Sequence, residues 1–334
     1  MKLFQKLNYY FGDKYNDLID KRIFAITGDI TEIGFGLNQE EILNLSNLID
    51  IVINTAANVS HYGNYNDFYN TNVKSVKNMI DFCLSFKKKL YHISTTSVSG
   101  KKLDKTFPQN KNIRKYEFNE SCLYVGQVLE NVYTRSKFEA ESFVLDAISK
   151  GLDGYILRLG NLMPRYKDGI FQENISANAF VNRMIAFIKL GAIPEYILKE
   201  SLEFTPIDYA AKAIYRIMTH VNRTNRVFHI YNQKYVSTKK IIKATKKLDY
   251  KIKVVSEKEF KKMIRKILKN EDAENILENL INDLDNDLHL DYKIDIIIKS
   301  RFSTNYLRRV FFKWPRISEK YIIRLLRLID KNEN

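Results

Sequence analysis

Short apolar runs rich in β-branched residues alternate along the first two thirds of this chain with longer stretches of helical periodicity. The apolar runs are residues 22–27, 50–56, 89–95, 154–160 and 226–232. Runs of this length are typical of buried strands. Apolar side chains three and four residues apart, as on the buried face of a helix, occupy residues 66–86, 133–149 and 207–219. The alternation predicts an α/β fold with parallel strands joined by crossover helices.

The strand pattern gives way at about residue 235 to basic amphipathic segments. Helices are expected there over roughly 238–248, 257–268, 272–284, 303–312 and 318–330. No linker rich in Pro, Gly or Ser separates this tail from the strand-rich part, so we expect the two parts to share an interface.

Composition excludes several classes of protein. A chain of 334 residues with 45% hydrophobic and 28% charged residues is long and apolar enough to bury a core. Two cysteines, Cys83 and Cys122, are too few for a disulfide framework or a zinc cluster, and the five histidines lack partners at metal-ligand spacing. No apolar run approaches the ~20 residues that span a bilayer. We therefore expect a cytoplasmic protein with no metal site and no membrane partner.

The formal net charge of +15 raises the question of a nucleic-acid partner. The lysines are spread along the whole chain in short groups, and no zinc-finger or RNA-recognition signature accompanies them. An AT-rich coding sequence also produces a composition rich in Lys, Asn and Ile. We therefore expect no nucleic-acid partner, while an acidic protein partner is compatible with the charge through electrostatic steering.

A phenol and an ammonium group stand one helical turn apart at Tyr133 and Lys137. Their helix follows a strand that ends in the hydroxyl-rich segment 92–97, at the edge of an α/β sheet where ligands bind. A phenol with a pKa of about 10 is a poor acid at neutral pH unless a cation stabilises its phenolate. Lys137 is placed to do so, and we expect Thr95 to align a carbonyl beside Tyr133.

Short sequence blocks in a fixed order add to this pattern. They are Gly28-Asp29-Ile30, Asn54-Thr-Ala-Ala57, Asn72-Val73, Ser94-Thr95, Tyr133 with Lys137, Arg158-Leu-Gly-Asn161, Gly191-Ala-Ile-Pro194, Phe204-Thr-Pro-Ile-Asp208 and Val227-Phe-His-Ile230. Together they resemble the extended short-chain dehydrogenase/reductases over about residues 22–232. The last four blocks are similar to the thioester reductase domains that end nonribosomal peptide synthetases and carboxylic acid reductases.

The resemblance implies a Rossmann-like doubly wound parallel sheet with a mostly helical C-terminal substrate subdomain. The dinucleotide-binding domain is expected over 1–165 plus 204–234, and the substrate subdomain over 166–203 plus 235–334. The implied reaction uses NADPH, with NADH not excluded. It reduces an acyl thioester held on the phosphopantetheine arm of an acyl or peptidyl carrier protein and releases an aldehyde, which a second reduction would convert to an alcohol.

The resemblance also implies roles for individual residues. Tyr133 protonates the developing oxyanion, Thr95 hydrogen-bonds the same oxygen, and Lys137 lowers the phenol's pKa and holds the nicotinamide ribose. Asn72 supports the lysine. The residues expected to hold the cofactor are Asp29, Ile30, Asn54, Ala56, Ala57, Lys137, Gly160 and Asn161.

One departure from the family concerns the Gly-rich turn that brings backbone amides to the pyrophosphate of a dinucleotide. Residues 27–36 imitate this turn, but the glycine spacing differs and Asp29 would repel a phosphate. We therefore expect the first strand and its turn to be missing, so that the chain begins inside the fold. Three interpretations stay open: the true start codon or gene lies upstream, the chain is the detached end of a larger synthetase, or it is a decayed protein that binds no dinucleotide.

Two other functions stay open at this point. A sugar-nucleotide epimerase or dehydratase belongs to the same extended family, although the blocks at 191–194 and 204–208 disfavour it. A truncated, non-catalytic remnant that only docks a carrier protein is the alternative that is not an enzyme.

Overall fold

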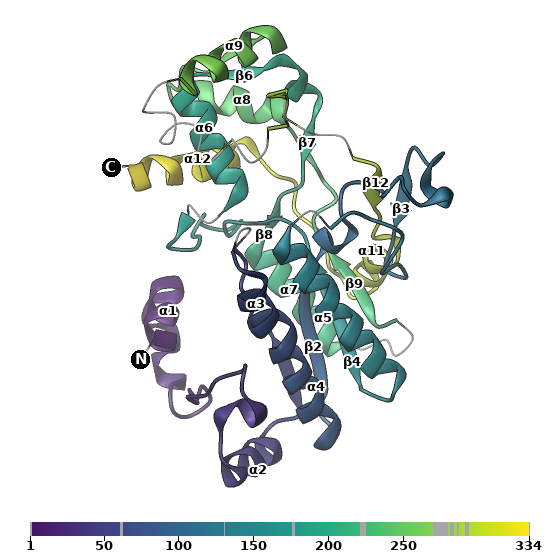
Figure 1. Ribbon diagram of the computed structural model, residues 1–334. Helices are drawn as coiled ribbons and strands as arrows, with labels where there is room; N and C mark the ends of the chain where they lie inside the picture. The colour runs from purple at the N-terminus through teal and green to yellow at the C-terminus, as the bar shows by residue number, and fades with distance from the viewer. Residues whose placement is uncertain are drawn as a thin grey trace.

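The computed structural model describes residues 2–60, 63–129, 131–175, 178–220, 225–269, 280, 284–285, 287–290 and 294–333. At its centre is a parallel sheet whose four strands run in the order β1, β2, β4, β9 (Figure 1). These strands are Ile51–Asn54, Lys89–Thr95, Gly154–Leu159 and Val227–Ile230. The strand order and direction confirm the α/β fold with a parallel sheet that the sequence predicts.

Helices cover both faces of the sheet, which explains why β4 and β9 are buried along their whole length. One face packs against α4 (Ser75–Ser85) and α5 (Val132–Ser149). The other packs against α7 (Ile207–Thr219) and α11 (Arg301–Arg309). The helices predicted over 133–149 and 207–219 are confirmed as α5 and α7. The one predicted over 66–86 is α3 (Tyr65–Phe68), a π-helical turn (Tyr69–Lys74) and α4.

A second hydrophobic core lies in a mostly helical part of the molecule (Figure 1). Its helices are α6 (Ala179–Leu190), α8 (Thr238–Lys246), α9 (Glu257–Ile267) and α12 (Glu319–Glu333). Buried side chains such as Val181, Phe260 and Leu326 join these helices. The helices predicted near 238–248, 257–268 and 318–330 are therefore confirmed, whereas most of the one predicted over 272–284 lies outside the described residues.

Short strands in the tail depart from the prediction that strands end near residue 235. They are β10 (Val236–Ser237), β11 (Lys253–Val255) and β12 (Ile296–Ile298). Each pairs with a strand from an earlier segment, namely β7 (Ser201–Leu202), β6 (Ala192–Pro194) and β3 (Tyr116–Phe118). Strands of two or three residues are too short to show a period of their own. Two further short strands, β5 (Leu162–Met163) and β8 (Thr205–Pro206), pair with each other.

A segment before the last helix, residues 294–312, returns to the sheet. The predicted helix near 303–312 is α11, and it packs against β9 and α7 rather than against the helical part. The preceding strand β12 pairs with β3 beside the sheet. The division into two domains stays a prediction. It assigns residues 294–312 to the substrate subdomain, whereas in the structure they lie beside the sheet.

The strand predicted over 22–27 is not formed. This segment makes only an isolated bridge, between Ile23 and Ile19. Phe24 and Ile26 are 64% and 60% exposed, and on the outer edge of β1 Ile51 and Ile53 are 40% and 46% exposed. Within the described ranges no strand pairs with residues 22–27 or with the outer edge of β1, and a strand needs a neighbour for its backbone groups. The prediction was wrong because the apolar pattern of a segment does not reveal whether it has a partner.

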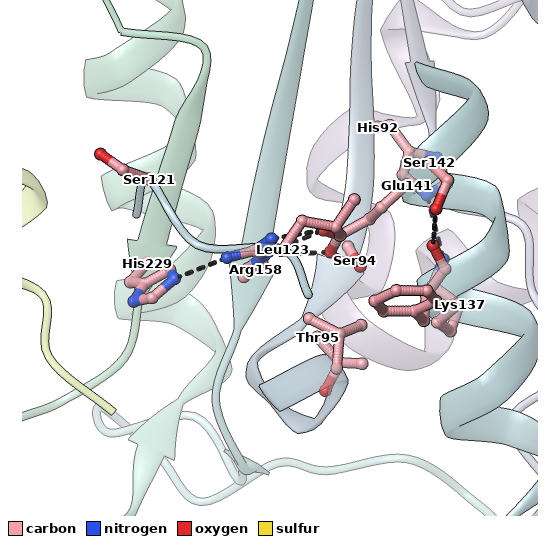
Figure 2. Close-up of polar contacts among 12 residues, drawn as sticks. His92, Ser94, Thr95, Ser121, Leu123, Lys137, Glu141, Ser142, Arg158 and His229 are labelled. Carbon is pink, nitrogen blue, oxygen red and sulfur yellow. Dashed lines mark hydrogen bonds and ion pairs between the residues drawn. The ribbon is translucent and has the colours of Figure 1, made fainter. Parts of the chain in front are cut away.

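A fully buried ion pair fastens α5 to the sheet (Figure 2). Arg158 Nη2 lies 2.7 Å from Glu141 Oε2, and Arg158 Nε donates to both carboxylate oxygens at 3.0 and 3.1 Å. Ser94 on the neighbouring strand donates to Glu141 Oε1, and Arg158 Nη1 lies 3.2 Å from His229 Nε2. Both charges are thereby hydrogen-bonded, as a buried ion pair requires.

We predict that Glu141→Gln lowers the free energy of unfolding by about 3–5 kcal/mol, because it leaves the Arg158 charge buried without a counter-ion. Urea unfolding followed by circular dichroism measures this. The control is Asp146→Asn, which breaks the exposed pair between Lys150 and Asp146 on the same helix and should cost less than about 1 kcal/mol. Equal losses in the two variants would contradict the role given to the buried pair.

Candidate active site

Thr95 and Tyr133 meet at the edge of the sheet where the carboxyl ends of the strands lie, called here the carboxyl edge. Thr95 is the last residue of β2, and its side chain hydrogen-bonds the Tyr133 hydroxyl. Tyr133 is in the first turn of α5, which Asn131 caps by accepting a hydrogen bond from Thr134 N at 2.8 Å. The strand end and the helix start are therefore neighbours, as a reductase site requires.

Lys137 lies one turn further along α5 and is buried. Its Nζ donates to the Ile93 carbonyl at 2.8 Å and lies 3.4 Å from His92 Nε2. Burial lowers the Lys137 pKa to about 8, and the Glu141 carboxylate opposes this. The pKa of the Tyr133 phenol is raised by burial, with the Thr95 hydrogen bond acting in the opposite direction. In this structure burial, not Lys137, therefore dominates the pKa of the phenol, which differs from the expectation.

Asn72 is in the π-helical turn between α3 and α4 and is fully buried. Its Nδ2 donates to Ser136 Oγ and to the Asn58 carbonyl, both at 2.9 Å, and its Oδ1 accepts from Asn58 N at 2.7 Å. Asn72 thus joins the loop after β1 to α5 at the residue beside Lys137. A π-helical turn is often found at functional sites. The predicted support of Lys137 is compatible with this position and stays a prediction.

The residues expected around the adenosine half of a cofactor lie on two loops. After β1, Asn54 Oδ1 accepts a hydrogen bond from Ala56 N at 3.1 Å, and Ala56 and Ala57 are half-buried. On the other loop Asp29 is exposed and accepts from Thr31 N and Oγ1, both at 2.8 Å, which lowers the Asp29 pKa. The carbonyl of its neighbour, Ile30, accepts from Asn78 of α4 at 3.0 Å.

Gly160 and Asn161 follow β4, and a carboxyl group that the sequence analysis missed lies against them. A Cβ atom at Gly160 would collide with the Glu203 carboxylate and with Tyr231, so this close approach needs glycine. Asn161 N donates to Glu203 Oε2 at 2.5 Å. Burial raises the Glu203 pKa to about 7, opposed by the hydrogen bonds from Thr205 and Asn161. The only sequence signal for Glu203 is its place directly before the block at 204–208.

The described residues fit one end of a dinucleotide and not the other. Thr95, Tyr133 and Lys137 present hydroxyl and amine groups near the carboxyl edge, as the nicotinamide ribose and a reacting carbonyl require. Within the described part of the chain, no Gly-rich turn joins a sheet strand to a helix so as to offer amides to a pyrophosphate. The segment that imitates one contains a short 3-10 turn, Ile33–Gly36, beside the Asp29 carboxylate.

The described residues contain neither a metal centre nor a membrane span. No group of three or more His, Cys, Asp or Glu side chains there could hold a metal ion. No helix there is long and apolar enough to cross a membrane.

The parallel sheet, with serine and threonine at the end of β2 and the tyrosine and lysine on α5, defines an extended short-chain dehydrogenase/reductase of the thioester reductase type. The chain belongs to the NAD-binding family described as male sterility protein, which matches residues 2–214.

Solved structures of nonribosomal peptide synthetase reductase domains are similar to this chain over nearly its whole length. A thiolation-reductase di-domain from an archaeal nonribosomal peptide synthetase is 34% identical, with a TM-score of 0.86, and the match covers 99% of this chain and 67% of that one. The reductase domain of the aureusimine biosynthetic cluster is 24% identical, with a TM-score of 0.78, over 100% of this chain and 80% of that one. The second likeness shows the fold alone.

Curated relatives are much longer than this chain. Glycine betaine reductase ATRR of Emericella nidulans is 25% identical over 239 residues, which are 71% of this chain and 18% of the relative. L-2-aminoadipate reductase of Saccharomyces cerevisiae is 24% identical over 286 residues, which are 82% of this chain and 20% of the relative. The chain therefore spans about a fifth of these two proteins.

We predict that a polypeptide of this sequence alone gives no saturable binding of NADPH at micromolar concentration. The amides of a Gly-rich turn at a helix N-terminus provide much of the binding of a pyrophosphate. Isothermal titration calorimetry measures the binding directly. The matched control is the same chain fused behind a strand, Gly-rich turn and helix of the dinucleotide-binding type, which should bind. Micromolar binding by the unfused chain would contradict the prediction.

Proposed function

We propose that this chain is an NADPH-dependent reductase of acyl thioesters held on a carrier protein, and that it releases an aldehyde. NADH is the alternative reductant. The observation that carries the proposal is the hydrogen bond between Thr95 and Tyr133, with Lys137 one turn further along the same helix. The similarity to a thiolation-reductase di-domain supports the choice of a thioester on a carrier as substrate.

The proposed reaction uses the two hydroxyl groups at the carboxyl edge. The thioester carbonyl oxygen accepts hydrogen bonds from Thr95 and Tyr133, which hold it where negative charge develops. A reduced nicotinamide supplies the hydride when it is bound. Tyr133 gives its proton to the carbonyl oxygen, and the resulting hemithioacetal breaks its carbon–sulfur bond to release the aldehyde and the free thiol of the phosphopantetheine arm.

The remaining predicted residues hold the reactants in this proposal. Lys137 binds the nicotinamide ribose and restores the Tyr133 proton. Asn72 keeps α5 in place through Ser136, which its side chain contacts. The loops that bind the cofactor are those that carry Asp29, Ile30, Asn54, Ala56, Ala57, Gly160 and Asn161. An acidic carrier protein suits the net charge of +15 through electrostatic steering.

A second candidate is a non-catalytic module that docks a carrier protein. It is favoured by the unpaired edge of β1 and by the lack of phosphate-binding amides within the described ranges. A sugar-nucleotide epimerase is less well supported, because a UDP-glucuronic acid 4-epimerase structure superposes with a TM-score of only 0.59, against 0.86 for the archaeal di-domain. The next experiment separates the reductase from the docking module.

We predict that Tyr133→Phe lowers the turnover of acyl-pantetheine thioesters by ~10²-fold or more, because the general acid is lost while the ring still packs. The assay follows NADPH oxidation by the fused chain described above, and calorimetry checks that NADPH binding is unchanged. Tyr10→Phe is the control, since Tyr10 also has a lysine four residues later, at Lys14, and lies in α1 (Lys2–Phe11). Wild-type turnover in Tyr133→Phe would remove this residue from the mechanism, and no turnover in any fusion would favour the docking module.

A further inference from the structure

His92 is fully buried on β2, between Asn54 and Lys137. Its Nδ1 lies 3.3 Å from Asn54 Nδ2, and its Nε2 lies 3.4 Å from Lys137 Nζ. Burial and the Lys137 charge hold the pKa of His92 well below its usual range, so the ring is neutral. A neutral imidazole has one N–H donor and one acceptor nitrogen. Which nitrogen carries the proton therefore decides what Lys137 faces.

Asn54 fixes that choice. The backbone N–H of Ala56 donates to Asn54 Oδ1 at 3.1 Å, so the oxygen of this amide must face Ala56. The NH₂ group then faces His92 and donates to Nδ1. The His92 proton consequently lies on Nε2, directed at Lys137. An ammonium has no acceptor for this proton, whereas a neutral amine has one.

The other groups around Lys137 do not reverse this preference. Tyr133 and Glu141 lie one turn before and one turn after it on α5. The Glu141 carboxylate favours the ammonium, but its two oxygens are engaged by Arg158 and Ser94. The Ile93 carbonyl accepts from Lys137 Nζ at 2.8 Å, which either form of the amine satisfies.

We propose that His92, oriented by Asn54, is a positioning residue that favours the neutral amine of Lys137. The proposal rests on the proposed function. There, Lys137 gives a proton to the Tyr133 phenolate after Tyr133 has protonated the substrate: an N–H bond breaks, an O–H bond forms, and solvent later returns the proton to the amine. The His92 N–H stabilises the amine at the moment when it is formed. A fixed ammonium ion could not exchange a proton in this way.

His229 provides an internal comparison, because its contacts fix the opposite tautomer. Its Nδ1 lies 2.7 Å from the Lys299 carbonyl, which only accepts, and its Nε2 lies 3.2 Å from Arg158 Nη1, which only donates. The two buried histidines should therefore carry their protons on different nitrogens.

Nitrogen NMR of the whole chain labelled with ¹⁵N-histidine tests the tautomers without requiring turnover. We expect a neutral His92 with its proton on Nε2 and a neutral His229 with its proton on Nδ1. The spectra of His92→Gln and His229→Gln assign the two signals. A proton on Nδ1 of His92, or a charged His92 at neutral pH, would overturn the proposal.

The titration of Lys137 tests the consequence, with ¹³Cε-lysine labelling and Lys137→Arg for assignment. The midpoint should lie near 8 in the unchanged chain. In His92→Gln it should rise, because the glutamine carbonyl can accept a hydrogen bond from the ammonium. His220→Gln, at the exposed end of α7, should leave it unchanged. An unchanged midpoint in a folded His92→Gln protein would overturn the proposal.

Asn54→Asp covers the case in which His92→Gln does not fold. It replaces the donor facing Nδ1 by an acceptor, so it should move the His92 proton to Nδ1 and raise the Lys137 midpoint. If the tautomer does not change in this variant, Asn54 does not orient His92. Because neither readout needs NADPH, a failure here is distinct from a failure of the reductase proposal, which appears only in the turnover assay.

Discussion

The geometry of the candidate site depends on the buried ion pair between Glu141 and Arg158. Glu141 is on the same face of α5 as Tyr133 and Lys137, at successive intervals of four residues. The pair joins this helix to β4, and Ser94, which contacts the same carboxylate, directly precedes Thr95 on β2. Moving Glu141 away from Arg158 would leave a buried charge without its partner, so this part of α5 tolerates little displacement from the sheet. The end of β2 and the start of α5 are therefore held together by a contact beneath the reacting groups.

The same network continues to residues 299–303, at the start of α11. Arg158 contacts His229 on β9, and His229 contacts the Lys299 carbonyl just before α11. Ser303 Oγ, in the first turn of α11, accepts a hydrogen bond from the His229 backbone N–H at 2.8 Å and donates to Glu120 Oε1 at 2.7 Å. A segment more than 150 residues away in sequence from Glu141 thereby contacts the same network through β9. This is the physical reason why 294–312 belong with the sheet and not with the helical part.

Much of this arrangement could be predicted from local patterns, and the rest depends on partners that a pattern does not contain. The parallel strands and α7 follow from periodicity, and the meeting of Thr95 with Tyr133 follows from strand ends sharing one edge. The segment 22–27 has the pattern of a strand but no neighbour within the described residues. The pKa values of Glu203 and His92 are shifted by burial and by contacts with residues remote in sequence. Spacing along the chain cannot reveal either cause.

The central claim is that the carboxyl edge of this sheet would hold a thioester carbonyl where a reduced nicotinamide can transfer hydride to it. The most direct measurement is mass spectrometry of the product formed from an acyl-pantetheine thioester and NADPH deuterated at the transferable position, using the chain fused behind a Gly-rich turn. The account predicts an aldehyde with one deuterium on the former thioester carbon, or an alcohol with two after a second reduction. A recovered thioester, or a carboxylic acid without deuterium, would contradict it.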